Sequence, residues 1–321
     1  MQTEDYPKLL GDIGGTNVRL ALKLSPDSEI SHILNLTLRD HAGAVEAIEH
    51  YLAQVGASAG PKRPRTGCLG AAGPVLGDHL QLFNAPWGFS IEGLRQALGL
   101  TRLRVLNDFT VLALALPHLP STELVQIGGE PPAPGMTMGV IGAGTGLGVS
   151  GLVPNLHGQW SPIGGEGGHV TLPASDDHEE RLIAVLRARF GHVSAERVLS
   201  GSGLVVLYEA HAQMAGVDAA VLTPADVTAR GLSAQCPLCA AALNSFCLFM
   251  GTVASNLAVS LGAQGGLYIG GGIVPRLGDF FVRSGFRARF DAKGRYTGYL
   301  SRIPVFVIHT PYPALIGAAQ A

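Results

Sequence analysis

Two glycine-rich turns in this sequence of 321 residues have the composition of phosphate-binding loops. The first, LGDIGGTN, places Asp12 just before Gly14, Gly15 and Thr16, and the second, GAGTGLG, spans residues 142–148. Glycine turns expose backbone N–H groups that can surround the oxygens of a phosphate. A carboxylate repels a phosphate chain unless a cation lies between them, so Asp12 predicts a Mg²⁺ ion, held through water. In the alternative interpretation, Asp12 only caps its own turn.

A second carboxylate that could do chemistry is Asp108. It follows Asn107 after the apolar segment LRVL and precedes the apolar segment FTVLALAL. At such a strand-to-helix junction the flanking elements hold a carboxylate in a fixed position, where it can accept the proton of an attacking hydroxyl group. Asp is also a preferred helix N-cap, and the two roles are compatible. We predict the catalytic role.

The segments after the glycine turns exclude two familiar phosphate loops. Residues 18–22, VRLAL, alternate with period two, and VSGLV follows the second turn, so both turns lead into strands. The dinucleotide fingerprint needs a helix at this point, and the P-loop needs a Lys at a fixed spacing that neither turn has. We therefore predict two β-hairpins with glycine tips, and the repeated pattern indicates a duplicated unit.

The remaining elements follow from hydrophobic periodicity and from capping residues. The Pro-rich segment 128–135 is the clearest internal break. Strands are expected at 8–13, 17–24, 30–38, 66–73, 103–106, 267–270 and 304–310, and helices at 42–55, 90–100, 109–116, 177–190, 201–213, 223–232 and 275–290, with a short helix at the C-terminus.

Composition restricts the class of protein. The chain is longer than a single core usually grows, so two lobes are expected. Its net charge is −2 without a long basic run, so neither nucleic acid nor an anionic membrane is an expected partner. Four cysteines and an N-terminus without a signal peptide predict a reducing cytosol. Residues 231–275 contain no charged side chain, and their recurring polar residues favour a buried helix and strand over a membrane span.

LGDIGGTNVRLAL resembles the first phosphate motif of the actin-like sugar kinases, and the whole chain resembles the proteobacterial, non-ROK type of bacterial glucokinase. The resemblance continues through LNDFT, PIGGEGGH, SAERVLSG and GGGIVPR. It implies an α/β, two-lobed actin-like ATPase (ribonuclease H-like) fold, each lobe a mixed sheet flanked by helices. The expected lobes are residues 1–117, completed by a C-terminal helix at 306–321, and residues 118–305. It also implies a cytosolic homodimer in glycolysis that uses ATP and Mg²⁺ to phosphorylate glucose at its 6-hydroxyl.

The resemblance also assigns roles to single residues. Asp108 would be the general base, with Asn107 beside it on the sugar, and Asn84 in LFNAPW falls where the family has a sugar-contacting loop. The triple glycine that follows the strand LYI would lie against the adenosine, although it could also be only a tight turn. The expected nucleotide contacts are Gly11, Asp12, Ile13, Gly14, Gly15, Thr16, Gly144, Thr145, Gly146, Gly270, Gly271 and Gly272.

Three further polar side chains are expected on the hexose. Glu166 and His169 lie among four glycines, which cannot form a core patch, and carboxylate and imidazole groups suit sugar hydroxyls. A metal site is not expected there, because no third ligand is evident. Glu196 is assigned by resemblance alone, and otherwise reads as a first-turn helix residue behind a Ser194 cap.

Cys236 and Cys239 form a C-x-x-C pair, which can be redox-active or half of a zinc site. No second pair or nearby His completes a zinc site, so we expect inert buried thiols together with Cys247. The ROK kinases carry a Cys-rich zinc motif after their sugar-binding His, whereas VTLPASDDHEE follows His169 here.

Three other functions remain open from the sequence. The kinase could prefer another hexose, such as mannose or an N-acetylhexosamine. A sugar sensor of the same fold would need no chemistry, but such regulators usually carry a helix-turn-helix extension, and only about ten residues precede the first strand. An ATPase without a sugar substrate would not need LNDFT and GGEGGH together.

Overall fold

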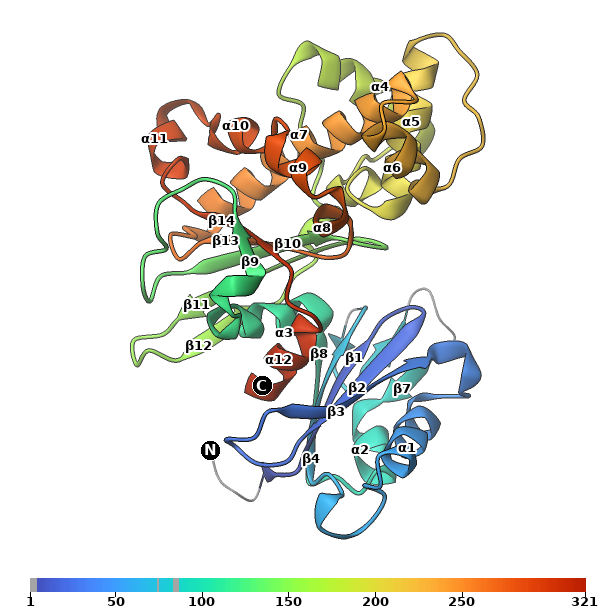
Figure 1. Cartoon of the computed structure of the whole chain (residues 1–321), viewed down its shortest axis with the longest axis vertical. Helices are drawn as coiled ribbons and strands as arrows, with labels where there is room; N and C mark the ends of the chain where they lie inside the picture. Colours follow the sequence, from blue (N-terminus) through green and yellow to red (C-terminus); the bar gives the residue numbers. More distant parts are fainter. Residues whose placement is uncertain (1–4, 74, 83–86) are drawn as a thin grey trace. The chain divides into compact units, whose positions relative to one another are not determined.

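The computed structural model describes residues 5–73, 75–82 and 87–321. The chain forms two compact units. Unit 1 comprises Met1–Pro120, Ser161–Gly164 and Thr310–Ala321, and unit 2 comprises Ser121–Trp160 and Gly165–His309. Each unit is an α/β structure built on its own mixed sheet, as the sequence predicts (Figure 1).

The sheet of unit 1 has the strand order β3-β2-β1-β4-β8. β1 pairs antiparallel with β2, and β4 and β8 continue the sheet in parallel from β1. A separate small sheet, β5-β6-β7, lies in the same unit. The bounds are β1 Lys8–Ile13, β2 Asn17–Lys23, β3 Ile30–Thr37, β4 Thr66–Ala71, β5 Val75–Leu76, β6 His79–Gln81, β7 Gly88–Ser90 and β8 Arg102–Asn107.

Helices cover both faces of this sheet because alternate strand residues point to opposite sides. Leu9 faces the core that the sheet forms with α1 (Ala44–Gln54) and α2 (Ile91–Ala97). Its neighbour Leu10 faces a second core, with α3 (Asp108–Ala115) and α12 (Pro313–Gln320). The C-terminal helix thus packs against α3 although about 200 residues separate them (Figure 1).

The six-stranded sheet, whose strands belong to unit 2 apart from residues 161–163 of β12, repeats this arrangement. Its order is β12-β11-β10-β13-β14-β9, in which β10 is antiparallel to β11, and β13 and β14 follow in parallel. The first five strands therefore match β3-β2-β1-β4-β8 in order, and the predicted duplication is confirmed at the level of topology. The bounds are β9 Leu124–Gln126, β10 Met138–Ala143, β11 Leu147–Pro154, β12 Trp160–Ile163, β13 Leu267–Gly270 and β14 Val305–Ile308.

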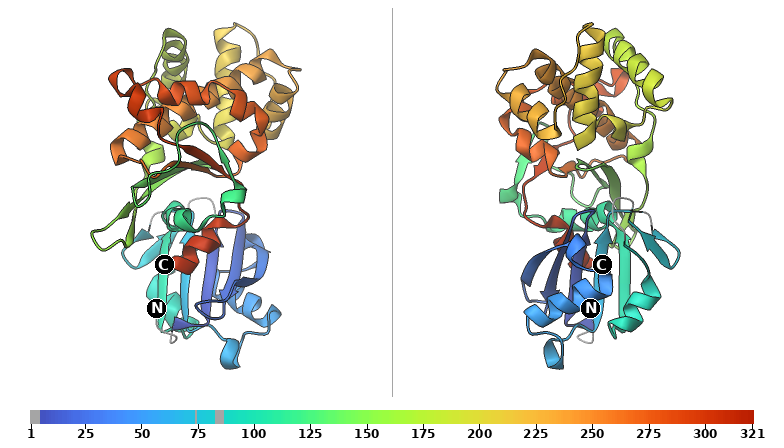
Figure 2. Two further views of the ribbon diagram at one scale, coloured as in Figure 1. Left: turned by 60° about the vertical axis from the view of Figure 1, so that its left-hand side comes forward. Right: turned by 90° about the vertical axis from the view of Figure 1, so that its right-hand side faces the viewer.

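The helices of unit 2 surround α7, Pro237–Leu261. Among the described residues α7 alone is long and apolar enough to cross a membrane, yet 72% of its apolar window is buried inside the protein. It packs on α5, α6, α10 and β10, so it is the core helix of this unit (Figure 2). The bounds of the others are α4 Asp177–Phe190, α5 Gly201–Met214, α6 Pro224–Leu232, α8 Ile273–Leu277, α9 Asp279–Arg283, α10 Phe286–Asp291 and α11 Thr297–Leu300.

Two predicted helices are wrong in extent. The helix expected at 275–290 is three short helices, α8, α9 and α10, which break at Gly278, where φ is +51°, and at Ser284–Gly285. The C-terminal helix expected at 306–321 covers only Pro313–Gln320, because Val305–Ile308 form β14 in the sheet of unit 2. A strand was expected at 304–310 and is confirmed, so the error lies in the bound of 306 given to the helix, which overlapped that strand.

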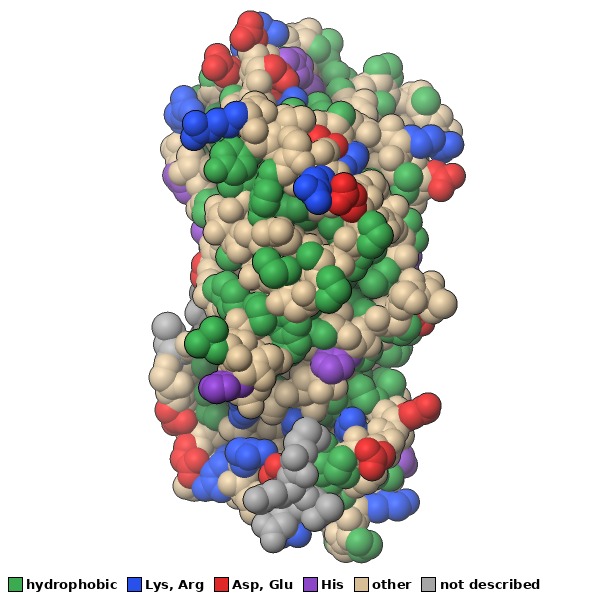
Figure 3. All heavy atoms as spheres, turned by 90° about the vertical axis from the view of Figure 1, so that its left-hand side faces the viewer, with side chains coloured by type: hydrophobic (Ala, Val, Ile, Leu, Met, Phe, Trp, Pro, Cys, Tyr) green, Lys and Arg blue, Asp and Glu red, His purple; other side chains and the backbone are tan. Residues whose placement is uncertain are grey.

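Surface charge agrees with the composition. On the face shown in Figure 3, acidic and basic side chains lie interspersed among uncharged ones and form no extended basic area.

Candidate active site

In unit 1, three parallel strands end in one row. Ile13 of β1 is the register partner of Ala71 of β4, which is in turn the partner of Asn107 of β8. Asp12 and Asp108 flank this row, so both carboxylates lie at the carboxyl edge of the same sheet. Ligands of open α/β sheets bind at this edge.

Asn107, and not Asp108, caps helix α3. Its Oδ1 accepts hydrogen bonds from the N–H groups of Phe109 at 2.9 Å and Thr110 at 3.3 Å. Asp108 is the first residue of the helix, and its Oδ1 also accepts from the N–H of Phe109, at 2.9 Å. The capping function that could have explained Asp108 therefore belongs mainly to its neighbour.

The first glycine turn joins β1 to β2 as predicted. The N–H of Gly14 donates to the carbonyl of Asn17 at 2.9 Å, and Gly15 and Thr16 are exposed at the tip. Gly11 and Ile13, by contrast, are buried in β1 between two neighbouring strands. They lie in the strand that leads into the turn, and their contact with a nucleotide stays a prediction.

Asp12 makes an ion pair that the sequence analysis missed. Arg19 is its cross-strand partner in the hairpin, and Nη1 of Arg19 lies 2.9 Å from Oδ2 of Asp12. The guanidinium also lies 5.9 Å from the ring centroid of Tyr312, the left-handed residue that starts α12. The alternation in NVRLAL puts Arg19 on the same side as Asp12, which is the signal that could have identified it.

The surroundings of Asp12 fit a magnesium ligand. Its side chain is only 18% exposed, and burial raises the pKa of this carboxyl, with Arg19 acting in the opposite direction. Among the described residues there is no cluster of three or more potential metal ligands. Mg²⁺ commonly uses one or two carboxylates together with waters and substrate phosphates, so a single carboxylate beside a phosphate turn is compatible with it.

In unit 2, the second glycine turn and the triple glycine lie side by side. Gly142 pairs in register with Gly270, and a Cβ on Gly271, whose φ is +77°, would meet the carbonyl of Ala143. The exposed Gly271 and Gly272 can therefore be approached closely by a ligand, whereas Gly270 is buried at the end of β13. Helix α8 begins at Ile273, so Pro275 does not start it as expected.

The two hairpins differ at one matched position. Asp12, next to last in β1, pairs with Arg19; Gly142, next to last in β10, pairs with Gly148. The second hairpin thus keeps the backbone turn and lacks the charged pair. Of the two hairpins, only the first carries a carboxylate of its own at this position.

Glu196 lies directly against the second turn. Its Oε2 accepts a hydrogen bond from the N–H of Leu147 at 2.9 Å and occupies the space where a Gly146 side chain would stand. Its Oε1 lies 3.9 Å from Nε2 of His169. Glu196 lies in the first turn of the 3₁₀ helix Ala195–Arg197 behind Ser194, as in the alternative interpretation, but Ser194 makes no side-chain capping bond there.

The glycines of GGEGGH let this segment pack on β11. A Cβ on Gly168 would meet the carbonyl of Leu147, and one on Gly167 would meet Val149. The segment forms the 3₁₀ turn Gly167–His169, which follows Glu166, and the side chains of Glu166 and His169 are exposed. Glu196, His169 and the second turn therefore form one cluster within unit 2. Asn84 lies outside the described residues.

The start of α5 is a further neighbour that the sequence analysis missed. The N–H of Gly201 donates to the carbonyl of Gly144 at 2.8 Å, and Ser200 caps the helix by accepting from Gly203. The start of this helix could have been predicted from the motif SGSG, because serine is a preferred N-cap.

The cysteines form no metal site in the described structure, and all four are free. Cys239 and Cys247 are buried, as expected, but Cys236 is only partly buried at the start of α7.

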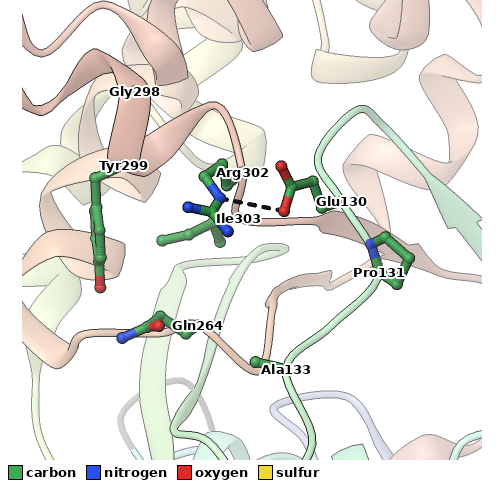
Figure 4. A pocket seen from close by; sticks show the side chains of 8 residues that line it. All are labelled: Glu130, Pro131, Ala133, Gln264, Gly298, Tyr299, Arg302 and Ile303. Carbon is green, nitrogen blue, oxygen red and sulfur yellow. Dashed lines mark hydrogen bonds and ion pairs between the residues drawn. The ribbon is translucent and has the colours of Figure 1, made fainter.

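A cavity of about 360 Å³ in unit 2 is lined by none of the predicted site residues (Figure 4). Gln264 and Ile303 line it just before β13 and β14, so it lies at the amino edge of these strands, opposite the triple glycine. An exposed ion pair lies at this cavity, with Nε of Arg302 3.1 Å from Oε2 of Glu130, and such pairs contribute little to the stability of the fold. The carboxyl edge remains the candidate site.

Comparison with known proteins gives one consistent family. The glucokinase family matches residues 9–321. A glucokinase from Aromatoleum aromaticum is 54% identical over 319 residues, which cover 99% of this chain and 95% of that protein. The crystal structure of a glucokinase from an Antarctic psychrotroph superposes with a TM-score of 0.89 at 36% identity and covers 98% of both chains.

A more distant structure shares the fold alone. A ROK-family glucokinase from Streptomyces griseus, solved with glucose and AMPPNP, has a TM-score of 0.64 at 20% identity. The expected actin-like fold is therefore confirmed, and the match along the whole length extends to the enzyme class. The chain belongs to the glucokinase family.

Proposed function

We propose that this enzyme phosphorylates D-glucose at its 6-hydroxyl with ATP, giving glucose 6-phosphate and ADP. The observation that carries the proposal is the row Ile13–Ala71–Asn107, which puts Asp12 and Asp108 at one edge of one sheet. One carboxylate beside a phosphate turn and another at a helix start match the two needs of phosphoryl transfer. These are a held nucleotide and an activated hydroxyl group.

Asp108 is the general base in this proposal. Its carboxylate accepts the proton of the 6-hydroxyl as that oxygen attacks the γ-phosphorus and the bond to the leaving ADP oxygen breaks. Base assistance of this kind contributes about 10²- to 10⁴-fold in rate. The Asn107 cap holds the start of α3 and thereby the position of Asp108.

Backbone N–H groups of the two glycine turns bind the phosphates, and the exposed pair Gly271 and Gly272 lies against the nucleoside. Asp12, oriented by Arg19, would hold Mg²⁺, which when bound neutralises the charge that develops on the phosphate oxygens. Positioning and electrostatics supply most of the acceleration in such reactions.

Glu166, His169 and Glu196, with Asn84 and Asn107, bind the hexose. Support for this assignment is the cluster in unit 2, where Glu196 and His169 lie within 3.9 Å of each other. Carboxylate and imidazole groups suit neighbouring sugar hydroxyls, which act as both donors and acceptors.

We also infer the proteobacterial, non-ROK type, a cytosolic location, a homodimer, a place in glycolysis, and neither membrane nor nucleic acid as a partner. The type is supported by the segment VTLPASDDHEE after His169, which has no cysteine. The absence of a nucleic acid partner is supported by the net charge of −2.

A coupled kinase assay with Mg·ATP over a panel of hexoses tests the function. We expect glucose to give the highest kcat/KM, above mannose and N-acetylglucosamine. A higher kcat/KM for another hexose would show that this hexose, and not glucose, is the preferred substrate. No phosphorylation of any hexose, by a folded preparation that binds nucleotide, would refute the activity.

A further inference from the structure

The C-x-x-C pair at the start of α7 has the arrangement of a dithiol that can react. Cys236 is the N-cap residue of α7, with an extended backbone (φ −131°, ψ 111°), and Pro237 is the first helical residue. Cys239 follows one turn later and is buried, while Cys236 is partly accessible. An accessible sulfur and a buried partner one turn apart are the two parts of a thiol–disulfide exchange site.

The turn before α7 keeps Cys236 in place. Ala234 has a positive φ of +56°, which reverses the chain after α6. The N–H of Cys236 then donates to the carbonyl of Arg230 at 3.3 Å. The partly accessible Cys236 therefore lies at a turn of fixed backbone geometry, directly after α6, whose last turn carries Arg230.

The two thiols differ in acidity. Cys236 makes no regular side-chain capping bond, yet the N–H of Cys239 one turn on faces its sulfur and lowers the pKa of this thiol. Burial raises the pKa of the Cys239 thiol to about 12, and the neighbouring Cys236 sulfur acts in the same direction. Since the thiolate is the nucleophile, Cys236 is the group that attacks.

We propose that Cys236 and Cys239 form a reversible intramolecular disulfide, and that the co-reactant is a low-molecular-weight disulfide such as glutathione disulfide. The Cys236 thiolate attacks one sulfur of the reagent, whose S–S bond breaks and releases one thiolate. Cys239 then loses its proton and attacks the Cys236 sulfur of the mixed disulfide, which releases the second thiolate. The protein loses two protons and two electrons, and the reagent takes them up to become two thiols.

Helix geometry permits this bond. Residues three apart in an α-helix have Cα atoms about 5 Å apart, within the roughly 4.4–6.8 Å that disulfides span. The other two cysteines lack these features, because Cys68 and Cys247 are fully buried and burial raises the pKa of these thiols to about 11 and about 12.

Treatment of the folded, full-length protein with glutathione disulfide tests the proposal by intact-mass and peptide mass spectrometry. We expect loss of two hydrogens, mapped to a bond between Cys236 and Cys239 and reversed by dithiothreitol. Cys239→Ser should stop at a single stable glutathione adduct on Cys236, and Cys236→Ser should remain unmodified. Cys247→Ser is the matched control in the same helix and should oxidise as the wild type does.

The rate of reaction with an aromatic disulfide gives a second readout that does not need the bond to close. We expect one fast thiol, lost in Cys236→Ser, that reacts about tenfold or more faster than Cys68 and Cys247. A wild-type protein that carries a stable glutathione adduct without closing the bond, or whose Cys236 reacts no faster than Cys68, would overturn the proposal.

Discussion

One oxygen of Glu196 accepts a hydrogen bond from the N–H of Leu147 at 2.9 Å, and the other lies 3.9 Å from Nε2 of His169. A single carboxylate thus joins the second glycine turn to a residue assigned to the hexose. Anything that moves this carboxylate should change both the turn and the sugar subsite.

Gly146→Ala tests this junction. The new Cβ would stand 2.5 Å from Oε2 of Glu196, so the flexible carboxylate must move away. We expect the Kd for glucose without nucleotide to rise about tenfold, the loss of roughly one good hydrogen bond to a charged group. Gly144→Ala is the control, because nothing lies within 4 Å of its Cβ. Isothermal titration that shows equal glucose affinity for the two variants would contradict the role of Glu196.

The pair of Asp12 and Arg19 should control the use of Mg·ATP. Asp12→Asn removes the charge that would hold the ion, so we expect the KM for Mg·ATP to rise about tenfold or more while the KM for glucose changes little. Arg19→Met should have a smaller effect in the same direction, and Arg19→Lys should recover part of it. Steady-state kinetics over a range of Mg²⁺ concentrations measures this. A rise in the glucose KM alone would exclude the metal role.

His211 should make stability depend on pH. It is 7% exposed, stacks on His178 and bonds to Ser245 Oγ at 2.9 Å. Burial, with His178 adding to it, lowers its pKa to about 4. The unfolded chain, with a pKa of about 6.5, binds the proton first, so about 3 kcal/mol of stability present above pH 6.5 is lost as pH falls to about 4.

Urea denaturation of the wild type and of His211→Gln at several pH values isolates this contribution. The variant should lose less stability between pH 6.5 and 4 than the wild type, whatever its stability at neutral pH. The exposed His157→Gln serves as the control and should follow the wild type. Parallel curves for wild type and His211→Gln would show that His211 is not responsible.

The C-terminal helix should be essential to unit 1. A Cβ on Gly317 of α12 would stand within 1.8 Å of the Val111 carbonyl of α3. Gly317→Ala must separate the two helices, and we expect a loss of about 1–3 kcal/mol in the free energy of unfolding. Gly298→Ala, in a helix with open space around it, should be neutral or slightly stabilising. Equal denaturation midpoints for the two variants would refute the tight contact.

Much of the fold was predictable because its signals are local. Period-two alternation on both sides of the glycine turns predicted the hairpins, and the helices predicted to start at residues 90 and 223 are capped by Ser90 and Thr223. The breaks between α8, α9 and α10 were not predictable, because they depend on how short segments pack. The strand at Val305–Ile308 was predicted from its own apolar run, whereas its parallel pairing with β13, far away in the sequence, was not.

The site was predictable in its residue types and less so in its contacts. Asp12 and Asp108 could be selected because each is an acidic residue next to a predicted turn or helix start. The ion pair of Asp12 with Arg19 could not, because it depends on the register between β1 and β2. The role of Glu196 could not be predicted from its neighbours in the sequence, because its contact with Leu147 joins segments 49 residues apart. The capping role of Asn107 was assigned to the wrong neighbour because Asn and Asp are equally good caps.

Asp108→Asn is the direct test of the catalytic assignment. Asn keeps an oxygen that can accept the N–H of Phe109, and Asn107 keeps the cap, so folding should be unaffected. Asp177→Asn, at the first position of α4, is the matched control and should leave kinetics unchanged.

The measurement is kcat for glucose with saturating Mg·ATP, together with the glucose KM. General-base catalysis by Asp108 predicts that Asp108→Asn lowers kcat by about 10²- to 10⁴-fold with a KM within a few-fold of wild type. A folded Asp108→Asn enzyme with the kcat of the wild type would contradict it.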